Sequence, residues 1–252
     1  MCPYKCLIFL IISVIYTCVE AQFNDLASNQ LYSQPLRVAT PKLDNLYLMQ
    51  NKLQQRNQQF LQPFLQQLQQ QEKVKIQLFY ECLCPDCRVF DTQQFAPTVK
   101  KLGNHLDVHI YPYGNARTII HAGGKIEVIC QHGPAECYGN MLHACAIDFL
   151  GNITLAVEFN TCMMSFDQNN KGSDNEAADK CGRLMNIDSG PIKHCAISRR
   201  GLMLLKNYGD ESKKVGFSSV PFILMNGNQY SGDNFLRDVC DIFRNPPSEC
   251  NE

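Results

Sequence analysis

The stretch Tyr80-Glu81-Cys82-Leu83-Cys84-Pro85-Asp86-Cys87-Arg88-Val89-Phe90 decides the fold of this chain. Before it, residues 74–80 alternate apolar and polar side chains as a β-strand does, with Val74, Ile76, Leu78 and Tyr80 on one face. After it, residues 87–102 have the apolar spacing of a helix, which we expect Pro97 to bend or interrupt. A Cys-x-x-Cys pair between a strand and a helix predicts a redox site.

The two cysteines of this pair have different predicted roles. Cys84 stands at the positive end of the helix dipole, where a thiolate is favoured, and we expect it to face solvent. Cys87 lies one turn inside the helix and is expected to be shielded. The depressed pKa that this placement implies for Cys84 is opposed by the neighbouring charge of Asp86. The sequence therefore predicts Cys84 as the attacking thiolate and Cys87 as the resolving thiol.

Length, charge and the amino terminus limit the class of protein. The chain has 252 residues and a formal charge of −1, which suit one domain and give no electrostatic preference for nucleic acid. An apolar run from Leu7 to Tyr16 is followed by Val19-Glu20-Ala21, so residues 1–21 are predicted to be a signal peptide. That run is too short to span a bilayer, and we expect no membrane anchor in the mature chain. The product is expected in the secretory pathway.

The number of cysteines predicts structural disulfides. Three of the 14 cysteines lie in the signal peptide, and eleven remain for an oxidising compartment. With Cys84 and Cys87 set aside, eight can pair internally, while Cys82 is the odd one and a possible link in a disulfide-bonded homodimer. The spacing does not determine which of the eight pair: Cys130, Cys137, Cys145, Cys162, Cys181, Cys195, Cys240 and Cys250.

Residues 22–73 differ in composition from the rest. They are polar and end in a glutamine-rich run, so we interpret them as an extension or propeptide outside the core. Leu46, Leu53 and Phe60 recur every seven residues, which leaves a short amphipathic helix as an alternative. The folded domain is predicted to occupy residues 74–252.

The remainder of the chain predicts further α/β structure. A second strand over residues 105–111 would complete a βαβ unit with a parallel pair. Residues 117–129 are predicted to form a hairpin, and a mainly helical, cysteine-rich insertion follows. Its later helices are expected near residues 154–166, 177–186 and 192–208. Asn152-Ile153-Thr154 is a glycosylation sequon and predicts a surface turn.

The last strand begins with a proline. Val220-Pro221 precedes a β-prone run to Met225, the Asn226-Gly227 turn and a terminal helix over residues 233–243. Because proline cannot donate a ladder hydrogen bond, its place requires a reason beyond strand propensity. We predict a cis proline beside Cys84, with the Val220-Pro221 backbone free to pair with an extended substrate.

A second motif carries a family resemblance. The segment Cys130-Gln131-His132-Gly133-Pro134-Ala135-Glu136-Cys137-Tyr138-Gly139-Asn140-Met141-Leu142-His143-Ala144-Cys145 matches the pattern CQHGxxECxxNxxxxC. With Pro112-Tyr113-Gly114-Asn115-Ala116 and the Val220-Pro221 landmark, it resembles the gamma-interferon-inducible lysosomal thiol reductases over roughly residues 74–250. The glutamine-rich extension and Cys82 depart from that family's pattern.

The resemblance implies a thioredoxin-like α/β fold with a disulfide-rich, mainly helical insertion. It further implies a glycoprotein of lysosomes or endosomes, or a secreted one, that reduces disulfides of unfolded proteins at acid pH. The catalytic pair carries over to Cys84 and Cys87, no metal or organic cofactor is expected, and an external thiol must regenerate the site. The cysteines of the CQHG segment are read as structural, and His132 receives no role.

Three other functions stay open. The two-residue insert of a CxxC motif does not by itself separate a reductase from an oxidase or isomerase. Cys82, Cys84 and Cys87 also have the soft thiolates that a metal-binding module would use. A secreted protein whose cysteines are all structural is the third possibility.

Overall fold

The computed structural model describes residues 48–56, 59, 61–62, 73–166 and 172–251. The chain divides into two units, Met1–Leu68 and Gln69–Glu252. In the first unit the described residues are helical and largely exposed, and Leu53 is exposed with them. The predicted signal peptide, most of the predicted extension, Leu46 and Phe60 lie outside the described residues.

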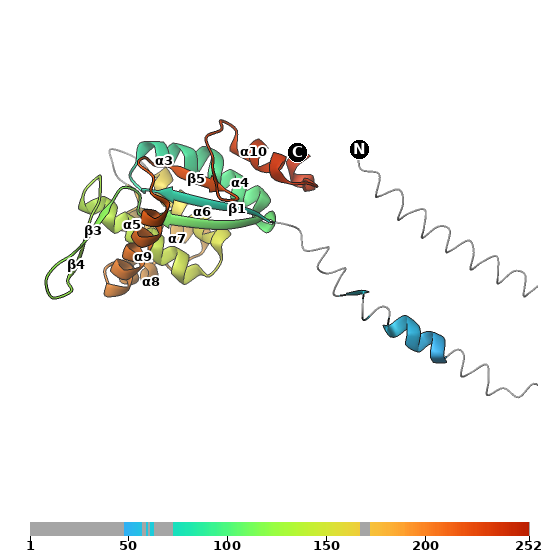
Figure 1. Ribbon diagram of the computed structural model, residues 1–252. Coiled ribbons are helices and arrows are strands. Elements are labelled where there is room, and N and C mark those ends of the chain that lie inside the picture. Colours follow the sequence, from blue (N-terminus) through green and yellow to red (C-terminus); the bar gives the residue numbers. More distant parts are fainter. Residues whose placement is uncertain (1–47, 57–58, 60, 63–72, 167–171, 252) are drawn as a thin grey trace, which may run out of the picture. The chain divides into compact units, whose positions relative to one another are not determined.

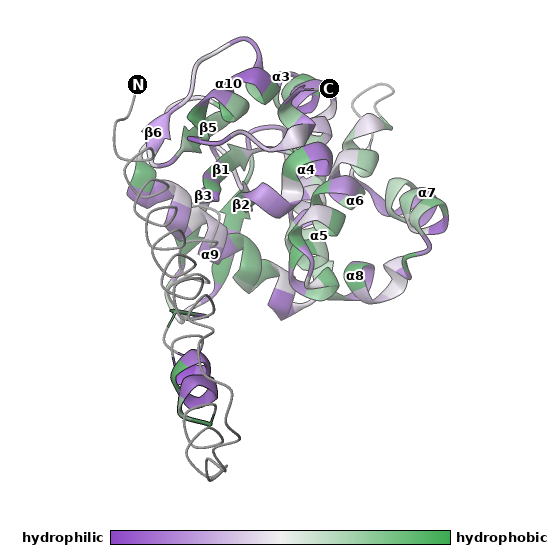
Figure 2. Ribbon diagram, turned by 90° about the vertical axis from the view of Figure 1, so that its right-hand side faces the viewer, coloured by the Kyte–Doolittle hydropathy of each residue, from purple (hydrophilic) through white to green (hydrophobic). Residues whose placement is uncertain are grey.

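A four-stranded mixed sheet forms the centre of the second unit (Figure 1). The alternation that predicted its first strand is confirmed, since Val74, Ile76, Leu78 and Tyr80 are all at most 2% exposed. The predicted parallel pair and the later antiparallel hairpin are confirmed as well. The strand order is β2-β1-β5-β6, with β1 (Val74–Tyr80), β2 (Leu106–Pro112), β5 (Phe222–Met225) and the hydrophilic edge strand β6 (Asn228–Gln229, purple in Figure 2).

The helix after β1 begins at Pro85, two residues before the predicted start. Proline suits the first helical turn because its missing N–H would have had no partner there. The expected interruption at Pro97 is confirmed, because a π-helical turn ends directly before the α-helical segment whose first turn contains Pro97. The path is α3 (Pro85–Phe90), the π-helical η1 (Asp91–Phe95), α4 (Ala96–Leu102) and the 3-10 turn η2 (Gly103–His105).

Both faces of the sheet are covered. The Val74-to-Tyr80 face shares one core with Phe95, Val99 and Phe235, contributed by η1, α4 and α10 (Phe235–Ile242). On the other face Phe79 stacks on Tyr111 with ring centroids 4.4 Å apart, and Tyr111 contacts Tyr208 edge to face. Burial on both faces fixes the end of β1, from which the chain enters the Cys84–Cys87 segment.

The cysteine-rich insertion has its own core. Leu142, Phe159, Met163 and Ile192 are fully buried together, as the predicted mainly helical insertion requires. The predicted hairpin, β3 (Arg117–Ile120) and β4 (Ile126–Ile129), precedes it. Its helices are α5 (Pro134–Leu150), α6 (Ile153–Ser165), α7 (Asn175–Met185), α8 (Ser189–Ala196) and α9 (Arg199–Val215); the short η3 (Ser248–Asn251) lies near the carboxyl end.

The prediction of a single helix over residues 192–208 is wrong. The chain instead forms α8 and α9, because Ser198 adopts an extended conformation and caps α9 by accepting a hydrogen bond from the Arg200 N–H at 3.1 Å. A Cβ at Gly201 would lie 2.6 Å from the Cys195 carbonyl oxygen. The close turn between the helices therefore requires a glycine at this position.

Polar side chains are buried where the sheet meets the insertion. The Tyr80 hydroxyl lies 2.9 Å from Nδ1 of His143, whose Nε2 lies 2.9 Å from the Ser173 hydroxyl. Asp91, the first residue after α3, is 5% exposed and accepts a hydrogen bond from the Thr161 hydroxyl. These contacts satisfy groups that would otherwise be costly to bury.

Candidate functional site

Cys84 and Cys87 lie at the start of α3, as predicted. Cys84 is the N-cap residue of that helix, and both cysteines are free thiols. The expectation that Cys87 is shielded is confirmed by its 1% exposure, but the expectation that Cys84 faces solvent is wrong, because Cys84 is only 8% exposed. The Cys84 Sγ lies 3.9 Å from the Val220 carbonyl oxygen, so a segment distant in sequence covers it.

The two thiols have opposite electrostatic environments. The Cys87 S–H donates to the Cys84 sulfur and, despite the cost of burial, lowers the pKa of Cys84 to about 6, helped by the backbone N–H groups of Cys87 and Asp86. The charge of Asp86 opposes this shift, as predicted. Burial, followed by the hydrogen bond to Cys84, raises the pKa of Cys87 far above its usual value. Cys84 is therefore the thiol that ionises first.

The Val220-Pro221 segment lies beside this pair. The peptide bond between the two residues is cis, as predicted, and β5 begins at the next residue. Val220 is separated from Cys84 by 136 positions, yet its carbonyl oxygen is in contact with the Cys84 sulfur. This arrangement leaves polar backbone next to the thiol that would attack a substrate.

Cys82 is the unpaired cysteine, as the parity of the sequence predicted. It is fully buried, its N–H donates to Oδ1 of Asn140 at 3.0 Å, and its Sγ lies 3.6 Å from the Glu136 carbonyl oxygen. A thiol in this position is not presented to a second chain. The structure therefore gives no support to a homodimer linked through Cys82.

We predict that Cys82→Ser retains disulfide exchange activity within a few-fold of the wild type. Burial raises the pKa of the Cys82 thiol well above its usual value, so it supplies almost no thiolate for the reaction. Steady-state turnover of a disulfide-bonded protein measures the effect, and a thermal melt confirms that the variant folds. A loss of activity as complete as in Cys84→Ser, with the fold intact, would contradict the assignment.

The other eight cysteines form four internal disulfides, as expected. Two of them cross the helical insertion and two close shorter loops before and after it. The pairs are Cys130–Cys137, Cys145–Cys195, Cys162–Cys181 and Cys240–Cys250.

Asn152 lies at the surface, where the sequon predicted it. Its side chain is exposed and caps α6 by accepting a hydrogen bond from the Leu155 N–H at 3.0 Å.

No helix among the described residues combines the length and the hydrophobicity that crossing a bilayer requires.

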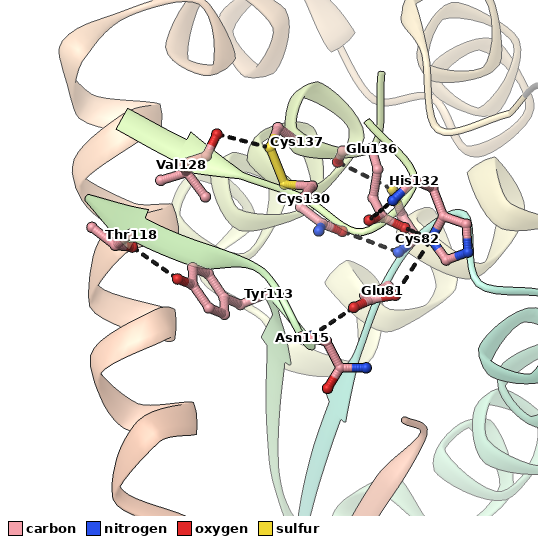
Figure 3. The surroundings of a disulfide bond; sticks show 11 residues. Glu81, Cys82, Tyr113, Asn115, Thr118, Val128, Cys130, His132, Glu136 and Cys137 are labelled. Carbon is pink, nitrogen blue, oxygen red and sulfur yellow. Dashed lines mark hydrogen bonds and ion pairs between the residues drawn. A yellow bond between two sulfur atoms is a disulfide. The ribbon is translucent and has the colours of Figure 1, made fainter. Parts of the chain in front are cut away.

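Sequence reasoning missed a cluster beside the active segment, formed by Glu81, His132 and Glu136 (Figure 3). Their possible metal-ligating atoms all lie within 4.8 Å of one another. Among the described residues Cys82, Cys84 and Cys87 do not form such a group. The His132-x-x-x-Glu136 spacing is a weak signal for two members, but nothing in the sequence places Glu81 against them. The three-thiol metal module therefore has no support in the geometry.

Comparisons with known proteins agree on one family and one fold. The family profile described as "Gamma interferon inducible lysosomal thiol reductase (GILT)" matches residues 75–185. "GILT-like protein 2" of Drosophila melanogaster is 36% identical over 65% of this chain and 74% of its own length. "Gamma-interferon-inducible lysosomal thiol reductase" of Carassius auratus is 31% identical over 71% of this chain and 72% of its own length. The crystal structure of reduced DsbA from Mycobacterium tuberculosis covers 71% of this chain and 86% of its own, with a TM-score of 0.50 at 18% identity, which supports the thioredoxin-like fold alone.

Proposed function

Because this chain belongs to the gamma-interferon-inducible lysosomal thiol reductase family, we propose that it reduces disulfide bonds of protein substrates through Cys84 and Cys87. The observation that carries the proposal is the asymmetry of the two thiols at the start of α3. The pKa of Cys84 is lowered to about 6, and the pKa of Cys87 is raised far above its usual value. Cys84 is therefore the thiol that ionises readily and attacks the substrate, and Cys87 stays protonated until the second exchange.

The reaction proceeds in two exchanges. The Cys84 thiolate attacks one sulfur of the substrate disulfide, the substrate S–S bond breaks, and the leaving sulfur takes a proton. Cys87 then gives up its proton and attacks the Cys84 sulfur, which releases the second substrate thiol and leaves a Cys84–Cys87 disulfide. Two equivalents of an external thiol reduce that disulfide and complete the cycle.

The backbone beside Cys84 provides the binding surface in this proposal. The Val220 carbonyl already contacts the Cys84 sulfur, so an extended substrate segment pairing with Val220 and Pro221 would bring its disulfide to the nucleophile. Such pairing uses main-chain groups and suits unfolded substrates of varied sequence. We place the enzyme in the secretory pathway, in lysosomes or endosomes or outside the cell, with a glycan on Asn152.

The lowered pKa of Cys84 suits work at acid pH. At pH 5 a pKa of about 6 leaves about one tenth of Cys84 ionised, against roughly one part in 3,000 for an ordinary cysteine. A less basic thiolate is also less nucleophilic, which reduces this gain of about 300-fold to about twentyfold. The net advantage still favours the shifted thiol.

We therefore expect the rate of reduction to rise with pH through a midpoint near 6 and to persist at pH 5 at about one tenth of its plateau. The assay follows reduction of a denatured disulfide-bonded protein from pH 4 to pH 8, with Cys84→Ser as the inactive control. A midpoint near 8.5 would contradict the mechanism. Faster oxidation of dithiols than reduction of disulfides under the same conditions would favour an oxidase.

A further inference from the structure

We propose that Glu81, His132 and Glu136 form a binding site for one divalent transition-metal ion. Glu81 directly follows β1, His132 lies in the turn before α5, and Glu136 lies in the first turn of α5; the three side chains point toward one another in Figure 3. The His132 Nδ1 lies 2.6 Å from Oε2 of Glu136 and 3.4 Å from Oε2 of Glu81. The site is distinct from the Cys84–Cys87 pair and does not depend on the proposed reductase activity.

The two carboxylates need a positive partner. Glu81 and Glu136 are both 0% exposed. Burying two carboxylates side by side is unfavourable unless a cation or a proton neutralises them. His132 offers one nitrogen to both, and only one proton can occupy that nitrogen.

A buried oxygen atom without a hydrogen-bond partner supports a cation at this place. Oε1 of Glu81 accepts the Asn115 N–H at 2.6 Å, whereas its Oε2 is buried and has no hydrogen-bond partner among the described residues. That oxygen faces His132, and the two lie close enough for one ion to reach both after small side-chain rotations. A buried carboxylate oxygen of this kind is where a bound cation would supply the missing interaction.

The donor set selects the class of metal. One imidazole nitrogen and two carboxylate oxygens suit Zn²⁺, which commonly takes three protein ligands and one open position. Mg²⁺ and Ca²⁺ prefer six or more oxygens and gain little from imidazole. The side chain of His132 is 33% exposed, which leaves the open position accessible to water. A bound ion would tie the segment that leads to Cys84 to the start of α5.

The supporting contacts hold the ligands in place. The His132 backbone N–H donates to Oε1 of Glu136 at 2.9 Å, which orients that carboxylate and leaves its Oε2 toward the cluster. Asn115 orients Glu81 in the same way. Preorganised second contacts of this kind strengthen metal binding.

The test is calorimetric titration of the full mature chain with ZnCl₂, after oxidation of Cys84 and Cys87 so that these thiols cannot bind metal. We expect one Zn²⁺ per chain, and at least tenfold weaker binding in His132→Ala, Glu136→Gln and Glu81→Gln, because each loses a ligand. Mg²⁺ should not compete at equal concentration. Thermal melts with and without Zn²⁺ provide a second readout, in which the wild type but not His132→Ala gains stability.

The matched control is His121→Ala on the hairpin. Its Nε2 lies 2.6 Å from Oε2 of Glu127, the same separation as in the His132–Glu136 pair, but the residues that the structure describes provide no third ligand there. This variant should bind Zn²⁺ as the wild type does. The proposal is overturned if the oxidised wild type binds no Zn²⁺, if only the reduced protein binds it, or if His121→Ala weakens binding as much as His132→Ala. Because His132 is exposed, its alanine variant tests the site even if Glu81→Gln fails to fold.

Discussion

In Cys87→Ser, a covalent complex between Cys84 and a disulfide-bonded substrate accumulates, and turnover ceases. Cys84 still attacks, because the backbone N–H groups of Cys87 and Asp86 continue to stabilise its thiolate. The buried thiol that would attack the Cys84 sulfur is absent, so the mixed disulfide has no internal route to resolution. A non-reducing gel after incubation with a denatured disulfide protein at about pH 5 shows the adduct, and added thiol releases it.

The matched variant is Cys84→Ser, which should form no adduct. Its remaining thiol, Cys87, is 1% exposed and holds its proton strongly, so it cannot begin the exchange. Adduct formation through Cys87 in this variant, with none through Cys84 in the other, would reverse the two roles. Absence of an adduct in both would favour a catalytically silent protein.

Loss of the Cys145–Cys195 disulfide has the largest expected effect on stability. This bond closes a loop of 50 residues and joins α5 to α8, and Cys145 is fully buried in the core of the insertion. For a loop of this length the chain-entropy estimate is about 4 kcal/mol. We expect Cys145→Ala/Cys195→Ala to lower the free energy of unfolding by about that amount, measured by urea denaturation.

The Cys130–Cys137 bond provides the comparison. It closes a loop of only 7 residues, for which the same estimate is about 2 kcal/mol. Cys130→Ala/Cys137→Ala should therefore unfold at a higher urea concentration than the first double variant. The reverse order would show that loop closure does not determine the contribution of these disulfides.

Local patterns in the sequence predicted the parts of the fold that depend on local chemistry. The alternation from Val74 to Tyr80 required burial of one face, and that face is buried. The Asn226-Gly227 turn and the parity of the cysteines were informative for the same reason, since each reflects a constraint within a short segment or a simple count. The break at Ser198 was missed because the apolar spacing continues across it, although serine is a favoured N-cap residue.

Features assembled by tertiary contacts were not predictable. Cys84 was expected to be exposed because a helix start usually is, but Val220 covers it from 136 positions away. The cluster of Glu81 with His132 and Glu136 likewise exists only because β1 ends against the start of α5. The disulfide pairings depend on the same packing, which spacing alone does not encode.

The buried polar groups between sheet and insertion also determine how folding responds to proton uptake. Burial, with a smaller effect of the Arg88 charge, lowers the pKa of His143 to about 3. The unfolded chain therefore binds a proton near pH 6.5 that the folded chain refuses, and by pH 5 the folded state has lost about 2 kcal/mol.

Asp91 responds in the opposite direction. Burial raises its pKa to about 7, against a weaker lowering by the Thr161 hydrogen bond, so the folded chain takes up a proton between pH 7 and pH 5 while the unfolded chain stays ionised. This uptake stabilises the folded state by about 2 kcal/mol over the same interval. The two contributions cancel, so acidification to pH 5 leaves the combined contribution of His143 and Asp91 to the free energy of unfolding almost unchanged. For these two buried groups, tolerance of acid therefore comes from two protonation effects of opposite sign and not from the absence of ionisable groups in the core.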